Sequence, residues 1–261
     1  MQLELAFIGV FPNPYGKDTR KKLEAVAKDR WEPDKEDFLK VINQSKTAKI
    51  QDISETENIM KFLGAIVLDA KKKERADKSI TRIDLITHSN PEWIALQGTV
   101  LLPKTEVARP TVSFPLDDTL DDFHLYKRLS NGVLDELDGS PADEIIVSKP
   151  QAKSGQGWKL ADIRKKFAPT AKLVLYSCES GVKRTKTSGV ARLLSHLAKT
   201  LGLTTVGGFM ADIRYHPKGE KVLLRLEDYR NTPDKLPPSE EKEDYRQLDS
   251  ERSYYVEVKP T

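Results

Sequence analysis

A chain of 261 residues, of which 38% are hydrophobic and 32% charged, is long enough to bury a sizeable core, and we interpret it as one large α/β domain. Its 43 basic and 40 acidic side chains nearly cancel, so it lacks the concentrated basic surface typical of nucleic-acid binding. One cysteine cannot form an internal disulfide, and no stretch approaches the roughly 18 apolar residues of a membrane helix. These features favour a cytoplasmic protein without membrane insertion or a nucleic-acid partner.

The first half of the chain predicts a strand, a helix and a second strand. The apolar run Leu3–Val10 is typical of a buried strand and not of a signal peptide, because no basic segment precedes it. Ser54-Glu55-Thr56-Glu57 is a capping box ahead of a helix. Ile80–Thr87 is the next predicted strand, and it ends at His88. The helix between them has one apolar face, made of Ile59, Phe62, Leu63, Ile66, Val67 and Ala70.

The middle of the chain is less regular. Short β-type runs at Trp93–Leu102 and Thr111–Phe114 predict a β-hairpin insert. Acidic residues then open an expected helix over residues 117–129. A further helix is expected over Trp158–Phe167, stopped by Pro169.

The stretch Lys172–Gly181 predicts a strand that carries the only cysteine, Cys178, at its end. A helix is expected over Ser188–Leu201, closed by Gly202, and a strand over Leu203–Phe209. This alternation of strands and helices predicts a mostly parallel central sheet with helices on both faces.

The C-terminal part divides from the rest by composition. We expect one domain over residues 1–230 and a charged, proline-containing segment over 231–261. Val222–Leu226 is a further candidate strand. Asn231–Glu251 has the composition of a disordered segment, and Ser253–Val258 predicts a terminal edge strand.

Two candidate catalytic residues, Cys178 and His88, each follow a predicted strand. Adjacent parallel strands would bring both to the same edge of the sheet, where ligands commonly bind in α/β folds. A cysteine attacks as the thiolate, and a histidine can take its proton and later protonate the leaving amine. The backbone amides of Ser89 and Cys178 are candidates for an oxyanion hole. On its own, a lone cysteine after an apolar strand is more often a small buried hydrophobe.

The segments L-V-L-Y-S-C-E-S-G, ending at Gly181, and D-L-I-T-H-S, ending at Ser89, resemble motifs of the caspase-like superfamily of cysteine peptidases (clan CD), closest to its bacterial caspase-like and CHAT-type branches. The resemblance covers roughly residues 54–210. It implies a three-layer sandwich, a Cys178/His88 dyad and cleavage of a protein or peptide substrate after a charged or polar residue. Such families usually have glycine after the histidine, where this chain has Ser89.

A charged residue beside the dyad would select the residue that precedes the cleaved bond. Asp212 follows the strand after the cysteine and Asp18 follows the first strand, so either is a candidate to bind a basic residue. Arg20 or Arg214 would instead bind an acidic one. We favour a basic residue slightly, and we leave the choice between these side chains open.

The sequence is also compatible with other functions. The exposed loops Lys149–Gly157 and Val182–Thr187 contain basic residues, which makes self-processing there a hypothesis. A non-catalytic caspase-like interaction module is the main alternative, with Ser89 spoiling the oxyanion site. A serine hydrolase at Thr87-His88-Ser89-Asn90-Pro91 lacks the glycines of a nucleophile elbow. Without a metal-ligand cluster or a phosphate-binding glycine loop, we expect no required cofactor.

Overall fold

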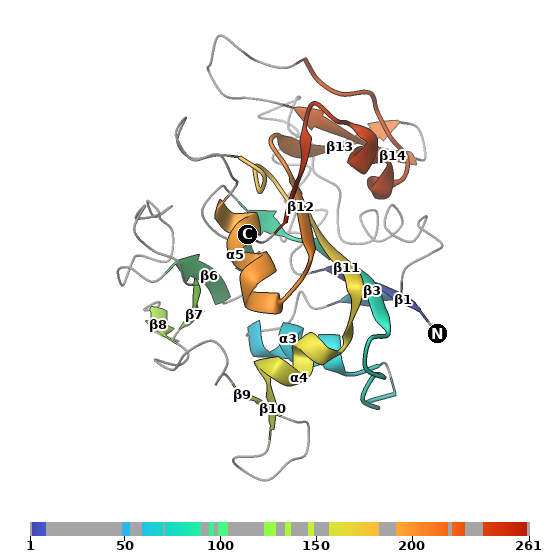
Figure 1. The fold of residues 1–261 in the computed structure, drawn as a ribbon. Coiled ribbons are helices and arrows are strands. Elements are labelled where there is room, and N and C mark those ends of the chain that lie inside the picture. Colours follow the sequence, from blue (N-terminus) through green and yellow to red (C-terminus); the bar gives the residue numbers. More distant parts are fainter. Residues whose placement is uncertain are drawn as a thin grey trace, which may run out of the picture.

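The computed structural model describes part of the chain, which is drawn as a ribbon in Figure 1. Its ranges are residues 2–8, 49–52, 59–69, 71–89, 94–96, 99–103, 123–128, 134–136, 146–148, 157–182, 192–218, 221–227 and 237–259.

A six-stranded sheet forms the centre of the fold, and five of its strands run parallel. The sixth strand, β15, pairs antiparallel at one edge. The predicted α/β architecture with a mostly parallel sheet is therefore confirmed, but the expected α-helices on both faces are not: within the described residues all three α-helices lie on one face. In spatial order the strands are β15 (Tyr255–Val258), β12 (Thr205–Phe209), β11 (Phe167–Tyr176), β3 (Ile80–Ile86), β1 (Leu3–Ile8) and β2 (Lys49–Asp52).

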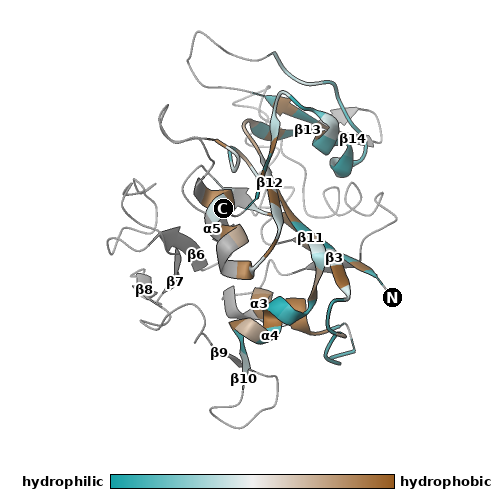
Figure 2. Ribbon diagram, viewed as in Figure 1, coloured by the Kyte–Doolittle hydropathy of each residue, from teal (hydrophilic) through white to brown (hydrophobic). Residues whose placement is uncertain are grey.

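Three helices cover one face of this sheet: α3 (Ile59–Val67), α4 (Leu160–Lys165) and α5 (Arg192–Leu201). Successive strand residues point to opposite faces, so alternate apolar side chains face the helices. Figure 2 shows hydrophobic residues along β3 and on the neighbouring helices. The strand residues in this core include Leu5, Phe7, Ile83, Leu85, Leu173 and Leu175.

The opposite face carries a second core, which the C-terminal part of the chain covers (Figure 1). A hairpin of β13 (Asp212–Lys218) and β14 (Lys221–Glu227) packs there, together with the 3-10 helix η2 (Tyr245–Ser250). Tyr245 and Leu248 of η2 are fully buried. The prediction of disorder over residues 231–251 is therefore wrong for its described part, residues 237–251, because these two side chains anchor that segment to the sheet.

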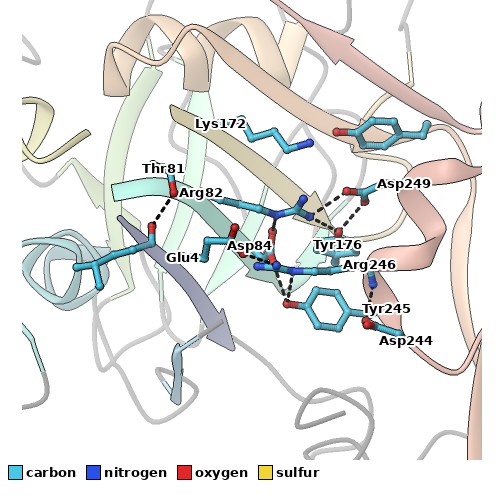
Figure 3. Close-up of polar contacts among 12 residues, drawn as sticks. Glu4, Thr81, Arg82, Asp84, Lys172, Tyr176, Asp244, Tyr245, Arg246 and Asp249 are labelled. Atoms are coloured by element: carbon cyan, nitrogen blue, oxygen red, sulfur yellow. Dashed lines mark hydrogen bonds and ion pairs between the residues drawn. The ribbon is translucent and has the colours of Figure 1, made fainter. Parts of the chain in front are cut away.

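Asp84, on β3, lies at the centre of a buried network of charges on this second face (Figure 3). Its side chain is 0% exposed and accepts hydrogen bonds from Arg82 Nε at 2.6 Å, Tyr245 Oη at 2.7 Å and Arg246 Nε at 2.6 Å. Arg246 also pairs with Glu4 on β1. A buried carboxylate is stable only when it is paired and hydrogen-bonded, and two arginines supply both conditions here.

Asp249 of η2 extends the network to β11, the strand that leads to the cysteine. Its carboxylate accepts hydrogen bonds from Tyr176 Oη at 2.6 Å and from Arg82 Nη2 at 2.9 Å. Arg82 Nη2 also donates to Tyr176 Oη at 2.7 Å. Burial and the neighbouring carboxylates raise the pKa of Tyr176 well above its usual value. The C-terminal segment is thus attached to the middle of the sheet by ion pairs as well as by apolar contacts.

Two smaller antiparallel sheets complete the described strands. One contains β4 (His88–Ser89), β5 (Ile94–Leu96) and β6 (Thr99–Pro103), the last two at the first run of the expected insert. Its other two strands, β7 (Phe123–Arg128) and β8 (Leu134–Glu136), lie beyond the insert, and the second expected run, Thr111–Phe114, lies outside the described residues. The expected helix over 117–129 is wrong in its second half, where β7 is a strand whose ladder to β6 overrides the local pattern. The second sheet pairs β9 (Ile146–Ser148) with β10 (Gly157–Lys159).

The expected helix over Trp158–Phe167 is shorter in the structure. Trp158 lies in β10, and β11 already begins at Phe167 and runs through Pro169. Proline is tolerated there because β11 has a register irregularity between Phe167 and Lys172, where no ladder donor is required. The helix α5 and its closing Gly202, with a φ of 63°, confirm the described part of the helix expected over Ser188–Leu201, whose residues 188–191 lie outside the described ranges.

Candidate active site

The ends of β3 and β11 lie side by side. The two strands are parallel neighbours, with Ile86 in register with Tyr176. Beyond the ladder, the amide of Thr87 donates to the Tyr176 carbonyl at 3.4 Å, and Ser89 Oγ donates to the Cys178 carbonyl at 2.6 Å. The segment that carries His88 therefore runs along the segment that carries Cys178. This confirms that the two candidate residues follow neighbouring strands.

His88 itself is described by its backbone, which opens β4 in register with Ala95. Its side chain lies outside the described part of the structure. The dyad contact and the oxyanion role of the Ser89 and Cys178 amides thus stay predictions.

A tight turn follows the cysteine. Glu179 has a φ of 53°, in the left-handed region that residues other than glycine rarely adopt. Its carbonyl accepts the amide of Val182 at 3.0 Å, and its own amide donates to the Ala211 carbonyl at 3.1 Å. A left-handed residue without glycine costs roughly 1 kcal/mol or more and persists only where its surroundings hold it. Such strain is found disproportionately at functional sites.

Ser180 and Gly181 hold this turn against the end of β12. Ser180 is buried, and its Oγ accepts the Phe209 amide at 3.1 Å and donates to the Ser177 carbonyl at 3.2 Å. The amide of Gly181 donates to the Phe209 carbonyl at 2.8 Å. A Cβ on Gly181 would lie only 2.5 Å from Val256 Cγ2. Packing alone thus accounts for Ser180 and Gly181, two residues of the S-C-E-S-G motif, independently of any role of the cysteine.

The Cys178 thiol is half-buried beside β13. Burial, together with the nearby Asp212 carboxylate, which accepts a hydrogen bond from the thiol, raises its pKa to about 12. The Ile213 amide and the Arg214 guanidinium lower the pKa of the thiol, but by less than burial and Asp212 raise it. The cysteine is therefore a neutral thiol at neutral pH, and it requires a base before it can attack.

The structure brings Asp212, one of the two candidate acidic residues, to the thiol. The Glu179–Ala211 hydrogen bond places Asp212 there, because Asp212 follows Ala211 directly and opens β13. Its carboxylate also pairs with Arg214 Nη2 at 3.2 Å. The two side chains that the sequence offers as opposite choices of specificity are thus bound to each other.

Asp18 and Arg20 lie outside the described residues, as do the loop over residues 149–156 and most of the loop over 182–187. Sequence reasoning missed the β13–β14 hairpin around Asp212, although Ile213 and Tyr215 alternate with polar residues there. It also missed Arg82 and Asp84. Their signal was two opposite charges at i, i+2 inside an otherwise apolar strand.

Comparisons with protein-family models, curated proteins and solved structures found no match to this chain. Within the described ranges, no three or more His, Cys, Asp or Glu side chains are grouped so that they could hold a metal ion. No helix in that part of the chain is long and apolar enough to cross a membrane.

Proposed function

We propose that the protein is a caspase-like cysteine endopeptidase with Cys178 as nucleophile and His88 as base. The observation that carries this proposal is the contact between the two strand ends, in which Ser89 Oγ donates to the Cys178 carbonyl at 2.6 Å. It places the residue after the histidine against the backbone of the cysteine. Because both strands end at the same edge of a parallel sheet, a substrate that reaches one residue reaches the other.

The thiol enters the reaction in its neutral form, because its pKa is raised to about 12. His88 takes the thiol proton as Cys178 attacks the substrate carbonyl, and returns it to the leaving amine. The amides of Ser89 and Cys178 donate to the oxyanion, and losing one such donor costs roughly 100- to 1000-fold in rate. Water then hydrolyses the thioester.

The substrate is a protein or peptide, cleaved after a basic residue. Support comes from Asp212, whose carboxylate lies against the thiol and is 24% exposed. A carboxylate in this position attracts a guanidinium or ammonium group to the bond that the cysteine attacks.

A non-catalytic interaction module is the second candidate, and the raised thiol pKa favours it. A cysteine evolved for attack usually lies in surroundings that lower its pKa. Here burial and Asp212 do the reverse. In that case the strained turn and the hairpin serve to bind a partner without cleaving it.

The experiment is a hydrolysis assay with a fluorogenic peptide panel that varies the residue before the cleaved bond. Wild type should cleave arginyl and lysyl peptides, and Cys178→Ala and His88→Ala should each abolish cleavage while unfolding at the wild-type temperature. Ser180→Ala controls for damage to the turn, since Ser180 holds the turn but has no chemical role. Cleavage that survives Cys178→Ala would overturn the proposal.

A further inference from the structure

Four charged side chains share one face of the β13–β14 hairpin beside the cysteine. In the antiparallel register Asp212 lies opposite Glu227, and Arg214 lies opposite Arg225. Residues directly opposite in such a pair lie on the same face of the sheet. Each carboxylate is bound by the arginine two residues away on its own strand, Asp212 by Arg214 and Glu227 by Arg225.

This arrangement juxtaposes like charges across the hairpin. Like charges directly opposite each other repel, so Arg225 disfavours the Arg214 guanidinium at this position, although the Arg225–Glu227 pair offsets part of that charge. The Asp212 carboxylate is next to the buried Glu227, which strengthens the attraction for a cation at that position. Asp212 is thus an acceptor of positive charge, and in the free protein the partly exposed Arg214 occupies it in a 3.2 Å ion pair.

We infer that Arg214 occupies, in the free protein, the position on Asp212 that the cationic side chain of a substrate takes when it binds. The inference rests on the proposed function. Arg214 and Asp212 are 35% and 24% exposed and lie 3.2 Å apart, and Asp212 accepts a hydrogen bond from the Cys178 thiol. A guanidinium bound at Asp212 therefore lies beside the nucleophile. Arg214 therefore competes with the substrate for Asp212. A basic side chain displaces it, and a neutral or acidic side chain does not.

The exchange replaces one cation on Asp212 by another. Incoming and outgoing groups have the same charge, so Asp212 is never left unpaired. A partly exposed ion pair contributes little to stability, which means that removing Arg214 should tighten the binding of a cationic ligand by roughly two- to fivefold. Arg214 thus tunes the affinity for the substrate and does not take part in the chemistry.

The test measures binding by calorimetry in a Cys178→Ala background, where no hydrolysis occurs. The probes are Nα-acetyl-arginine amide and its neutral isostere Nα-acetyl-citrulline amide. Arg214→Ala and the bulkier Arg214→Gln should both tighten binding of the arginine amide by roughly two- to fivefold. Asp212→Asn should abolish that binding. The exposed Arg252→Ala makes the same charge change elsewhere and should leave the affinity unchanged.

Equal affinity for the two amides, or an unchanged affinity in both Arg214 variants, would overturn the inference. The hydrolysis assay separates this failure from that of the proposed function. If wild type cleaves no peptide but the Arg214 variants bind the arginine amide more tightly, the cation site stands and the peptidase proposal falls. If wild type cleaves peptides and the Arg214 variants show no gain, only the role of Arg214 falls.

Discussion

The Ser89 hydroxyl donates a 2.6 Å hydrogen bond to the carbonyl of Cys178, and so ties the end of one central strand to the end of its neighbour. If the protein is the caspase-like peptidase that we propose, glycine is expected at position 89, where this chain has serine. In this fold the serine has a use that glycine could not serve. It fixes the segment after His88 against the cysteine turn.

Ser89→Ala should therefore lower the free energy of unfolding by about 1 kcal/mol, the usual net contribution of one partly buried hydrogen bond. Urea denaturation followed by tryptophan fluorescence measures it. The matched control is Ser250→Ala, which removes a hydroxyl bonded to Gln247 at an exposed site and should cost less. An equal cost for both variants would show that the Ser89 contact contributes nothing particular.

The thiol should alkylate slowly at neutral pH and faster at alkaline pH. With its pKa raised to about 12, the reactive thiolate is a small fraction at pH 8 and grows about tenfold with each pH unit up to pH 10. Iodoacetamide labelling followed by intact-mass spectrometry measures this. A rate that levels off below pH 9 would mean that the thiol has an ordinary pKa.

Asp212→Asn should speed this labelling at pH 8. The carboxylate disfavours the thiolate, so its removal lowers the thiol pKa and raises the thiolate fraction. Asp77→Asn, which alters an exposed carboxylate paired with Lys166, is the control and should leave the labelling rate unchanged. Slower labelling in Asp212→Asn would show that the carboxylate does not act on the thiol in this way.

Asp84→Ala should destabilise the protein by about 3–5 kcal/mol, because it leaves Arg82 and Arg246 buried beside an empty site. Glu240→Ala, which removes an exposed carboxylate from Lys242 while Lys242 keeps its pair with Glu251, should cost no more than about 1 kcal/mol. Both values come from urea denaturation. A small cost for Asp84→Ala would mean that the charges on the second face are solvated and not buried.

Gly181→Ala should cost about 1–3 kcal/mol, because the new methyl group would meet Val256 Cγ2. The double variant Gly181→Ala/Val256→Ala should be more stable than the sum of the two single changes allows, since it removes the clash. If the free-energy costs of the two single changes simply add in the double variant, the strain lies elsewhere. This pair separates the packing role of Gly181 from any catalytic one.

The pairing of the two strand ends was predictable because its signals are local. Ile80–Ile86 and Phe167–Tyr176 contain apolar runs that end at His88 and Cys178, and an intervening helix makes them parallel. Their adjacency in the sheet followed from those patterns. The placement of the side chains beyond the strand ends did not follow from these local patterns.

The C-terminal segment shows why. Residues 240–251 are rich in charge and were expected to be disordered, yet Tyr245 and Arg246 bind Asp84, which is about 160 positions earlier. No local pattern reveals that a charge in one segment has its partner in another. The same holds for Asp212, which meets the thiol only because the turn at Glu179 bonds to Ala211.

The most direct test of the Cys178/His88 dyad is covalent labelling by a peptidyl chloromethyl ketone that ends in arginine. The dyad predicts that wild type gains the mass of one inhibitor on Cys178 far faster than it reacts with iodoacetamide. His88→Ala should lose this advantage, and Cys178→Ala should gain no mass. Equal labelling of wild type and His88→Ala would contradict the dyad.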